Sequence, residues 1–257
     1  MRANYHTHTW RCGHAIGGEE DYVKTAIEQG FNILGFSDHT PQFFPKGYVS
    51  RIRMEPEELP NYCATIRNLR DRYRDSIRIH VGLEAEYYPA LFSELLPAVR
   101  DQGVEYLLLG QHYLGNEQDQ PYNGAPTTDV SILRRYCEQS MEAMQTGCFT
   151  YFAHPDLIRF QGDHATYRKH MRRLCQEAKS CGIPLEMNLL GLWSNRNYPD
   201  MRFWALAAEE GCQVLLGWDA HAPEQLCKPD AEKTLRMAAK QLGLELLDWV
   251  EFRKIGE

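Results

Sequence analysis

Seven short apolar stretches of this 257-residue chain each end in residues that can bind metal ions or transfer protons. These residues are histidines, aspartates and glutamates, in the order His6-Thr7-His8, Asp38-His39, Glu84-Ala85-Glu86, Gln111-His112, His154-Pro155-Asp156, Glu186-Met187-Asn188 and Asp219-Ala220-His221. Seven of the ten histidines, His14 among them, lie at or just beyond such an end. Imidazoles gathered in one place repel one another when protonated, whereas metal ions bind them in the neutral form. The pattern therefore predicts a site for several metal ions.

The donor types restrict the metal. Imidazole and carboxylate groups without thiolate suit Zn²⁺, Mn²⁺ or Fe²⁺. His6 and His8 are two residues apart on a predicted strand, so their side chains share a face. The candidate ligands outnumber those of one tetrahedral ion, which implies two or three divalent ions. Glu84 and Asp219 are the best candidates to bridge ions. Cys12, between His8 and His14, could be a ligand but is interpreted as a bystander among harder donors.

The elements that position these residues alternate along the chain. The seven apolar runs are typical of buried parallel strands, and they cover residues 3–6, 32–37, 77–84, 106–110, 148–153, 183–187 and 213–217. Helical spacing follows each run, over residues 19–29, 56–73, 90–102, 129–146, 165–180, 199–210 and 228–241. Most of these helices are followed by a glycine that can take the left-handed conformation of a helix stop.

This alternation predicts an α/β fold with a parallel sheet. Seven strand–helix units suit a closed barrel better than an open sheet, and no Gly-x-Gly-x-x-Gly follows the first strand. The carboxyl ends of parallel barrel strands converge on one face, so the polar strand ends would form a single site. Two long connections, residues 40–54 and 115–128, are candidate binding loops or lids.

Composition excludes several classes of protein. The net charge of −7 argues against a nucleic-acid partner, because such proteins carry a basic surface. No apolar run has the length of a membrane span, and the first residues lack the apolar region of a signal peptide, so we expect a cytoplasmic protein without a membrane partner. The eight cysteines include no Cys-x-x-Cys and are expected to be free thiols.

Together the motifs resemble the PHP (polymerase and histidinol phosphatase) superfamily. The resemblance covers the whole chain in order, through His6-Thr7-His8-Thr9, Ser37-Asp38-His39, Gly82-Leu83-Glu84, Gly110-Gln111-His112, His154-Pro155-Asp156-Leu157 and Asp219-Ala220-His221. The segment from Arg53 to Pro60 resembles the histidinol-phosphatase-like branch. The resemblance implies a distorted (β/α)7 barrel, TIM-barrel-like, formed by residues 1–257 as one PHP domain, with the metal site at the C-terminal ends of the strands.

Carried over residue by residue, the resemblance also implies three metal positions. The first would use His6, His8, Glu84 and Asp219; the second would use Glu84, His112 and His154; the third would use His14, His39 and His221. The branch binds the substrate phosphate with arginines. Arg159 matches by its place after His154, and Arg196 is the second candidate.

The implied activity is that of a metal-dependent phosphatase acting on a small phosphomonoester. A histidinol-phosphatase-like enzyme converts L-histidinol phosphate and water to L-histidinol and phosphate. Metal ions lower the pKa of bound water from about 15.7 to about 7, which would supply a bridging hydroxide as nucleophile. Asp156, or a histidine next to the metals, would protonate the leaving alkoxide. Asp38 would act beside it in catalysis or orient an imidazole, and Glu186 and Asn188 would contact the substrate or support the ligands.

Two other functions remain open at this point. The first is another PHP-family metal-dependent hydrolase, such as a phosphodiesterase, a nuclease or a phosphatase with a different substrate, because one fold supports many reactions. The second is a metal-binding module without catalysis that accompanies a polymerase. The acidic charge favours a small-molecule substrate over nucleic acid.

Overall fold

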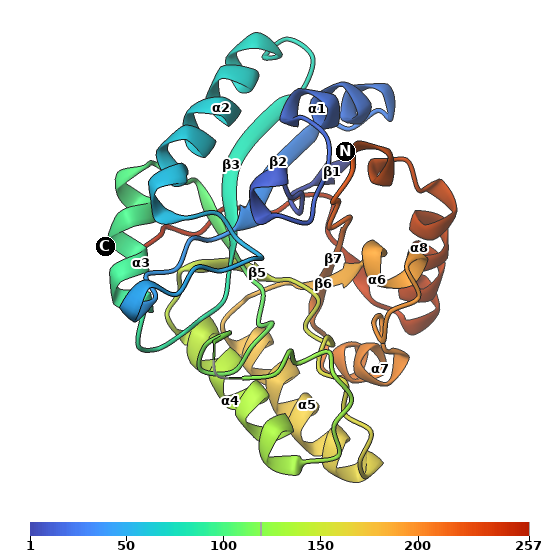
Figure 1. Cartoon of the computed structure of the whole chain (residues 1–257). Coiled ribbons are helices and arrows are strands. Elements are labelled where there is room, and N and C mark those ends of the chain that lie inside the picture. The colour runs from blue at the N-terminus through green and yellow to red at the C-terminus, as the bar shows by residue number, and fades with distance from the viewer. Residues whose placement is uncertain (119, 257) are drawn as a thin grey trace.

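Eight parallel strands, hydrogen-bonded in chain order, curl into a distorted barrel with the helices arranged around it (Figure 1). This computed structural model describes residues 1–118 and 120–256. The strands are β1 (Ala3–Asn4), β2 (Ile33–His39), β3 (Arg78–Ala85), β4 (Tyr106–Leu109), β5 (Phe149–Phe152), β6 (Leu185–Asn188), β7 (Gln213–Gly217) and β8 (Glu245–Leu246). The seven predicted strands and the distorted barrel are confirmed.

The barrel closes where its first and seventh strands end. Thr7, after β1, forms a parallel bridge with Ala220, after β7. The His8 amide donates to the Ala220 carbonyl at 2.9 Å, and the Ala220 amide donates to the His6 carbonyl at 3.3 Å. This closure brings two ends of the sequence side by side, and with them the histidines and aspartate of the first and seventh strand ends.

The helices follow the predicted positions closely. They are α1 (Glu19–Glu28), α2 (Leu59–Arg72), α3 (Phe92–Asp101), α4 (Val130–Gln145), α5 (His164–Ser180), α6 (Leu189–Trp193), α7 (Met201–Glu210) and α8 (Pro229–Leu242). Gly211 ends α7 at φ 69° and Gly243 ends α8 at φ 71°, the left-handed stops that the sequence predicts. Within the described residues no helix combines the length and apolar character needed to cross a membrane.

Three features differ from the predicted elements. Strand β8 is a two-residue strand beside the start of β7, too short to give a periodic signal. Helix α6 has five residues, is capped by Asn188 and lies in a segment for which no helix is predicted from the sequence. Strand β2 continues through His39, because its pairing with β3 extends to the register His39–Glu84. Asp38 and His39 therefore sit on a strand and are rigidly placed.

The lower part of the barrel is filled by aromatic side chains. Tyr106 lies across the interior, and its hydroxyl donates to the Tyr5 carbonyl at 2.8 Å. A Cβ on Gly35 or Gly82 would lie 2.2 Å or less from Tyr106 atoms, so glycine at both positions makes room for the ring. Phe252, from the C-terminal segment, stacks on Tyr106 from below at 4.6 Å. The polar strand ends thus lie above a packed aromatic layer, which forms the floor of the site.

Candidate metal centre

Four donor atoms from the first, third and seventh strand ends meet above this floor. His8 Nε2 lies 3.1 Å from Asp219 Oδ1 and 3.4 Å from Glu84 Oε2. His6 Nε2 lies 3.4 and 3.5 Å from the same two oxygens, and 3.2 Å from His8 Nε2. Ligand atoms of a tetrahedral ion with bonds of about 2.0–2.1 Å are about 3.3–3.4 Å apart. The inner group, which we define as His6, His8, Glu84 and Asp219, therefore has the spacing of ligands to one ion.

Hydrogen bonding does not explain why these atoms converge. Glu84 Oε2 is buried and makes no hydrogen bond among the described residues, although His39 Nδ1 lies only 3.1 Å away. A buried carboxylate oxygen without a partner is costly, and a divalent cation would satisfy it together with the surrounding lone pairs. The residues present therefore fit a divalent metal ion.

The other carboxylate oxygen of Glu84, Oε1, faces His112 and His154. Glu84 Oε1 lies 2.9 Å from His154 Nε2 and 3.5 Å from His112 Nε2. A Cβ at Gly110 would stand 2.1 Å from Oε1, so only glycine leaves space for this carboxylate. Glu84 thus connects the inner group to a second group with His112 and His154, the arrangement expected of a bridging carboxylate.

A third group, which we call the outer group, consists of His14, His39 and His221. Ring nitrogens of the three lie within 4.8 Å of one another, and His14 Nε2 is 3.1 Å from His221 Nε2. His14 is exposed, His221 is half-buried and His39 is buried. The structure therefore brings the side chains of all nine predicted ligands close together, and seven of them line one cavity.

The surroundings shift the pKa values of the histidines in this centre in opposite directions. Burial lowers the pKa of His6, but the carboxylates of Glu186, Asp219 and Glu84 raise it well above its ordinary value. Burial and the neighbouring His8 hold the pKa of His39 and of His221 well below the ordinary value. His39 and His221 are therefore neutral near pH 7 and present the lone pairs that a metal ion requires.

The carboxylate of Glu186, behind the candidate ligands, fixes the orientation of the His6 ring. Glu186 Oε2 lies 2.8 Å from His6 Nδ1, so Nε2 of that ring faces the inner group. Asn188 donates to Glu186 Oε1 at 2.7 Å and to Asp219 Oδ2 at 3.2 Å. Of the two roles that the sequence leaves open for Glu186 and Asn188, these contacts favour support of the metal ligands over contact with substrate.

Glu86 and Arg53 have a role that sequence reasoning missed. Glu86 Oε1 lies 2.9 Å from His112 Nδ1, and Arg53 donates to both Glu86 oxygens at 2.8 and 3.0 Å. Burial raises the pKa of Glu86, but Arg53 and His112 bring it down to about 2. Arg53 also contacts Glu117 and so joins the two long loops. The available signal was Glu86 itself. It lies just after the end of β3 and two residues after Glu84, a spacing that puts two side chains on the same face of an extended segment.

Asp38 lies behind the ligands. Its carboxylate accepts a hydrogen bond from the His39 amide at 2.8 Å and contacts Thr9, and it lies 3.5 Å from His8 Nδ1. These contacts hold the first two strand ends together. They favour the predicted role of Asp38 as a group that orients an imidazole.

Asp156 lies away from the opening. Its carboxylate accepts from the Asp200 amide at 2.6 Å and from Trp204 Nε1 at 2.9 Å, both at the start of α7. Burial raises the pKa of Asp156 to about 7. The expectation that Asp156 protonates the leaving group gains no support from these contacts, because its side chain is not part of the cavity lining among the described residues.

Seven of the nine candidate ligands line a cavity of about 160 Å³. The rest of its wall consists of Ile52, Tyr113, Tyr122, Arg196 and Tyr198. Burial raises the pKa of Tyr122 to about 12, which keeps its hydroxyl protonated as a hydrogen-bond donor. The cavity can therefore hold a small molecule between metal ions and a cationic, aromatic wall.

The two predicted arginines lie at different depths. Arg196 lines the metal cavity and donates to the Tyr198 hydroxyl at 2.9 Å. Arg159 is exposed and lines a neighbouring hollow, which shares Tyr122, Arg196 and Tyr198 with the cavity. The structure thus brings Arg196 to the metal groups, with Arg159 farther out on the same wall.

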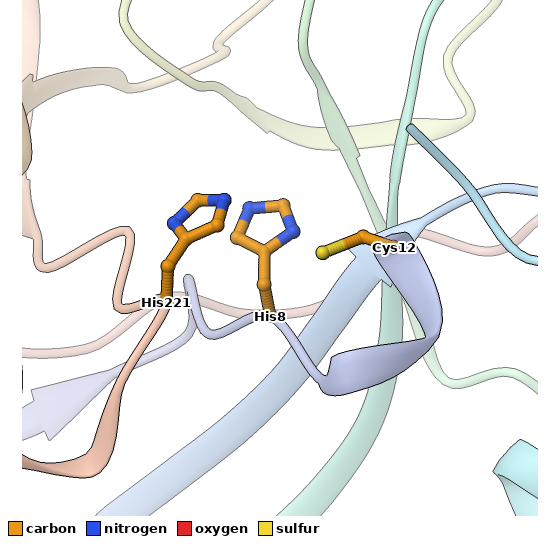
Figure 2. Close-up of side chains that lie close together, drawn as sticks. All are labelled: His8, Cys12 and His221. Carbon is orange, nitrogen blue, oxygen red and sulfur yellow. The ribbon is translucent and has the colours of Figure 1, made fainter. Parts of the chain in front are cut away.

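Cys12 stands at the edge of the centre. It ends the 3-10 helix Trp10–Cys12, and its thiol is completely buried. Its sulfur, a ring nitrogen of His8 and a ring nitrogen of His221 lie within 4.8 Å of one another (Figure 2). Its place between His8 and His14 in the sequence already put Cys12 near these histidines.

Comparison with known proteins identifies related sequences. The sequence model of the PHP domain matches residues 4–189. A protein of Deinococcus radiodurans named probable histidinol-phosphatase is 30% identical over 230 residues, which cover 86% of each chain. A protein of the same name from Schizosaccharomyces pombe is 27% identical over 257 residues, which cover 88% of this chain and 82% of that protein.

Solved structures share the fold. The crystal structure of histidinol phosphate phosphatase from Lactococcus lactis, complexed with zinc, L-histidinol and phosphate, matches with a TM-score of 0.75 at 19% identity and covers 99% of this chain and 98% of that chain. A putative histidinol phosphatase from Listeria monocytogenes matches with a TM-score of 0.71, also at 19% identity, over 87% of this chain and 97% of that chain.

Proposed function

This chain belongs to the PHP domain family, and on that premise we propose that it is a metal-dependent phosphatase that hydrolyses L-histidinol phosphate to L-histidinol and phosphate. The relatives that match most of its length carry the name histidinol-phosphatase. The observation that carries the proposal is the convergence of nine metal-type side chains, seven of which line a small cavity that Arg196 also lines.

The proposed centre binds two or three divalent ions, which are Zn²⁺, Mn²⁺ or Fe²⁺. The inner group would hold one ion, Glu84 with His112 and His154 a second, and the outer group a third. When bound, such ions neutralise phosphoryl oxygens and activate water for attack on phosphorus. Because ligands come from both His6 and His221, residues 1–257 act as one domain in this proposal.

The arginines and tyrosines of the wall would bind the phosphate. Arg196 offers two parallel N–H groups, the geometry that matches two oxygens of a phosphoryl group. The Tyr122 hydroxyl, which stays protonated, donates to a third oxygen. Arg159 extends this positive surface outward and attracts the dianionic ester before it reaches the cavity.

The remaining lining suits a small organic leaving group. Ile52 and Tyr113 offer an apolar and aromatic surface next to the metal ligands, on which an imidazole ring can pack. Asp38 and Glu186 support the ligands from behind and do not contact the substrate. In this proposal Asp156 positions the start of α7, close to the segment that carries Arg196.

A substrate panel tests the proposal. Protein purified without chelator, and reloaded with Mn²⁺ or Zn²⁺, is assayed against L-histidinol phosphate, other small phosphomonoesters and phosphodiesters. We expect L-histidinol phosphate to give the highest kcat/KM and the diesters almost no turnover. Preferential cleavage of a diester or of another monoester would replace the proposed substrate and keep the metal-dependent chemistry. No turnover of any ester with fully loaded protein would contradict the proposal.

A further inference from the structure

Asn4 is a completely buried polar side chain two residues before His6. Its Oδ1 accepts hydrogen bonds from the backbone amides of His6 and Trp218, each at 3.1 Å. Its Nδ2 donates to the His6 carbonyl at 3.1 Å and to the Thr7 hydroxyl oxygen at 2.9 Å. This one side chain thus uses both of its donors and both acceptor positions, and its partners leave only one orientation for its oxygen and nitrogen.

These hydrogen bonds lie at the seam where the barrel closes. Strand β1 has only two residues, and the backbone bridge to the segment after β7 joins Thr7 and Ala220. Trp218 lies between the end of β7 and that bridge, and its amide donates to the Asn4 side chain. The Asn4 side chain therefore takes the place of a backbone acceptor that the short first strand does not provide.

Two residues of the inner group are attached to this seam. Asn4 holds His6 by both its backbone amide and its carbonyl. On the other side of the seam, Trp218 directly precedes Asp219, whose φ of 51° lies in the left-handed region that residues other than glycine seldom adopt. Such a backbone conformation persists only where its surroundings hold it, and the fixed Trp218 amide is one of these restraints.

We propose that Asn4 is a positioning residue for the inner group, which fixes the spacing of the His6 and Asp219 side chains across the seam. His6 Nε2 and Asp219 Oδ1 are 3.4 Å apart, the spacing of two ligands of one tetrahedral ion. Two backbone hydrogen bonds to Ala220 hold the seam on the side of the metal centre, and Asn4 holds it from the side of Trp218. Because the amide is neutral, it does so without adding a charge beside the ligands.

The inference rests on the proposed function in one respect, because both require a metal ion in the inner group. It concerns how the ligands are held before an ion arrives. Ligands that already have their final spacing lose less free energy to ordering of the backbone when they bind. We therefore expect Asn4 to affect metal affinity and kcat, and to have little effect on KM, since Arg196 lies on another segment.

Titration of the zinc-loaded protein with a chelator compares variants at this position. We expect Asn4→Ala to bind its tightest Zn²⁺ ion about 10–100-fold less tightly and to lose kcat, with the other ions changed less than about threefold. Asn4→Asp should recover most of this affinity, because its carboxylate still accepts from both backbone amides and the Thr7 hydroxyl can donate to the second oxygen. The control Leu174→Ala, which removes a buried apolar side chain on α5, should lower the melting temperature and leave zinc affinity unchanged.

Amide hydrogen exchange of the wild type, with and without zinc, provides a measurement without any variant. We expect the His6 and Trp218 amides to stay protected after zinc is removed, because Asn4 holds both without an ion. Rapid exchange of these amides in folded metal-free protein, or wild-type affinity for every ion in Asn4→Ala, would overturn the inference. An equal loss of affinity at all ions that Asn4→Asp does not recover would also overturn it. Turnover on the same samples keeps the two questions apart, because protein that binds zinc as expected but hydrolyses no ester contradicts the proposed function alone.

Discussion

The inner and outer groups of the candidate metal centre both contain histidines, but the two groups are held differently. Every residue of the inner group is at most 3% exposed, and the carboxylate of Glu186 fixes His6 at 2.8 Å. In the outer group His14 is exposed. Nδ1 of His14 lies 2.8 Å from the Cys12 carbonyl oxygen, and Nδ1 of His221 lies 2.9 Å from that of Asp219.

These differences concern both rigidity and electrostatics. A carboxylate behind an imidazole makes the ring a stronger ligand than a neutral carbonyl does. The inner ligands also include Glu84 on a central strand, whereas His14 lies on a loop after a short 3-10 helix. We infer that ions of the inner group bind tightly and support the fold, and that the outer ion exchanges more readily.

The largest effect is expected from Glu84→Gln, which removes the charge shared by the inner and second groups. The substitution keeps the shape of the side chain but leaves one ligand oxygen and no negative charge. We predict loss of at least one ion and a fall in kcat of more than about 100-fold, beyond that of residues that only support ligands. Elemental analysis and turnover on the same sample measure both. The exposed Glu245→Gln is the control, and full metal content with normal kcat in Glu84→Gln would rule out the bridge.

Single histidine substitutions compare the two groups directly. His6→Ala removes an inner candidate ligand and leaves the buried Glu186 Oε2 without its imidazole partner, whereas His14→Ala removes an exposed outer one. We expect His6→Ala to lower kcat about tenfold more than His14→Ala and to lower the melting temperature as well. Activity of His14→Ala should recover at high added metal. Equal losses of activity and stability in the two variants would show that the groups are held alike.

The positions of the candidate metal ligands were predictable because they depend on strand ends. Parallel strands bring their carboxyl ends to one face, and every predicted ligand lies at or just after such an end. The assignment to three groups comes from the family resemblance, and the structure also places residues of different groups together, such as His6 with Glu84 and His154. The chain closure between Thr7 and Ala220, which sets the inner group, has no local sequence signal, because it depends on tertiary pairing.

The supporting residues were harder to predict. Arg53 lies far from Glu86 in sequence, and nothing in its neighbourhood indicates a buried guanidinium with two carboxylate partners. Asp156 follows a ligand at a strand end as closely as other site residues do, yet it contacts the start of α7. The direction in which a loop side chain points depends on the packing of other segments and cannot be inferred from spacing.

A smaller effect is expected at Glu86, which supports His112 in the second group. Glu86→Gln keeps a hydrogen-bond partner for His112 Nδ1 but removes the charge that pairs with Arg53. We predict a loss of affinity for one ion of about 10–100-fold, with the inner ion retained. Arg53→Ala should have a similar effect and also raise the protease sensitivity of residues 40–54 and 115–128. Metal titration and limited proteolysis distinguish this from a general loss of stability, which would weaken all ions equally.

The smallest expected effects concern substrate binding by the two arginines, which extends the comparison from metal to phosphate. Arg196 lines the metal cavity and Arg159 the hollow beside it, so their contributions should differ in size. We predict that Arg196→Ala raises KM and the inhibition constant of free phosphate about tenfold, because a charge-assisted pair is lost next to the metals. Arg159→Ala should raise both only about two- to threefold, and more so at low salt, because an exposed cation acts mainly through long-range attraction. Metal content should be unchanged in both variants, and Arg196→Lys should recover only part of the affinity, since an ammonium cannot form two parallel bonds. A larger effect at Arg159 than at Arg196 would mean that the phosphate sits in the outer hollow, and the proposed geometry of attack from the metal side would then be wrong.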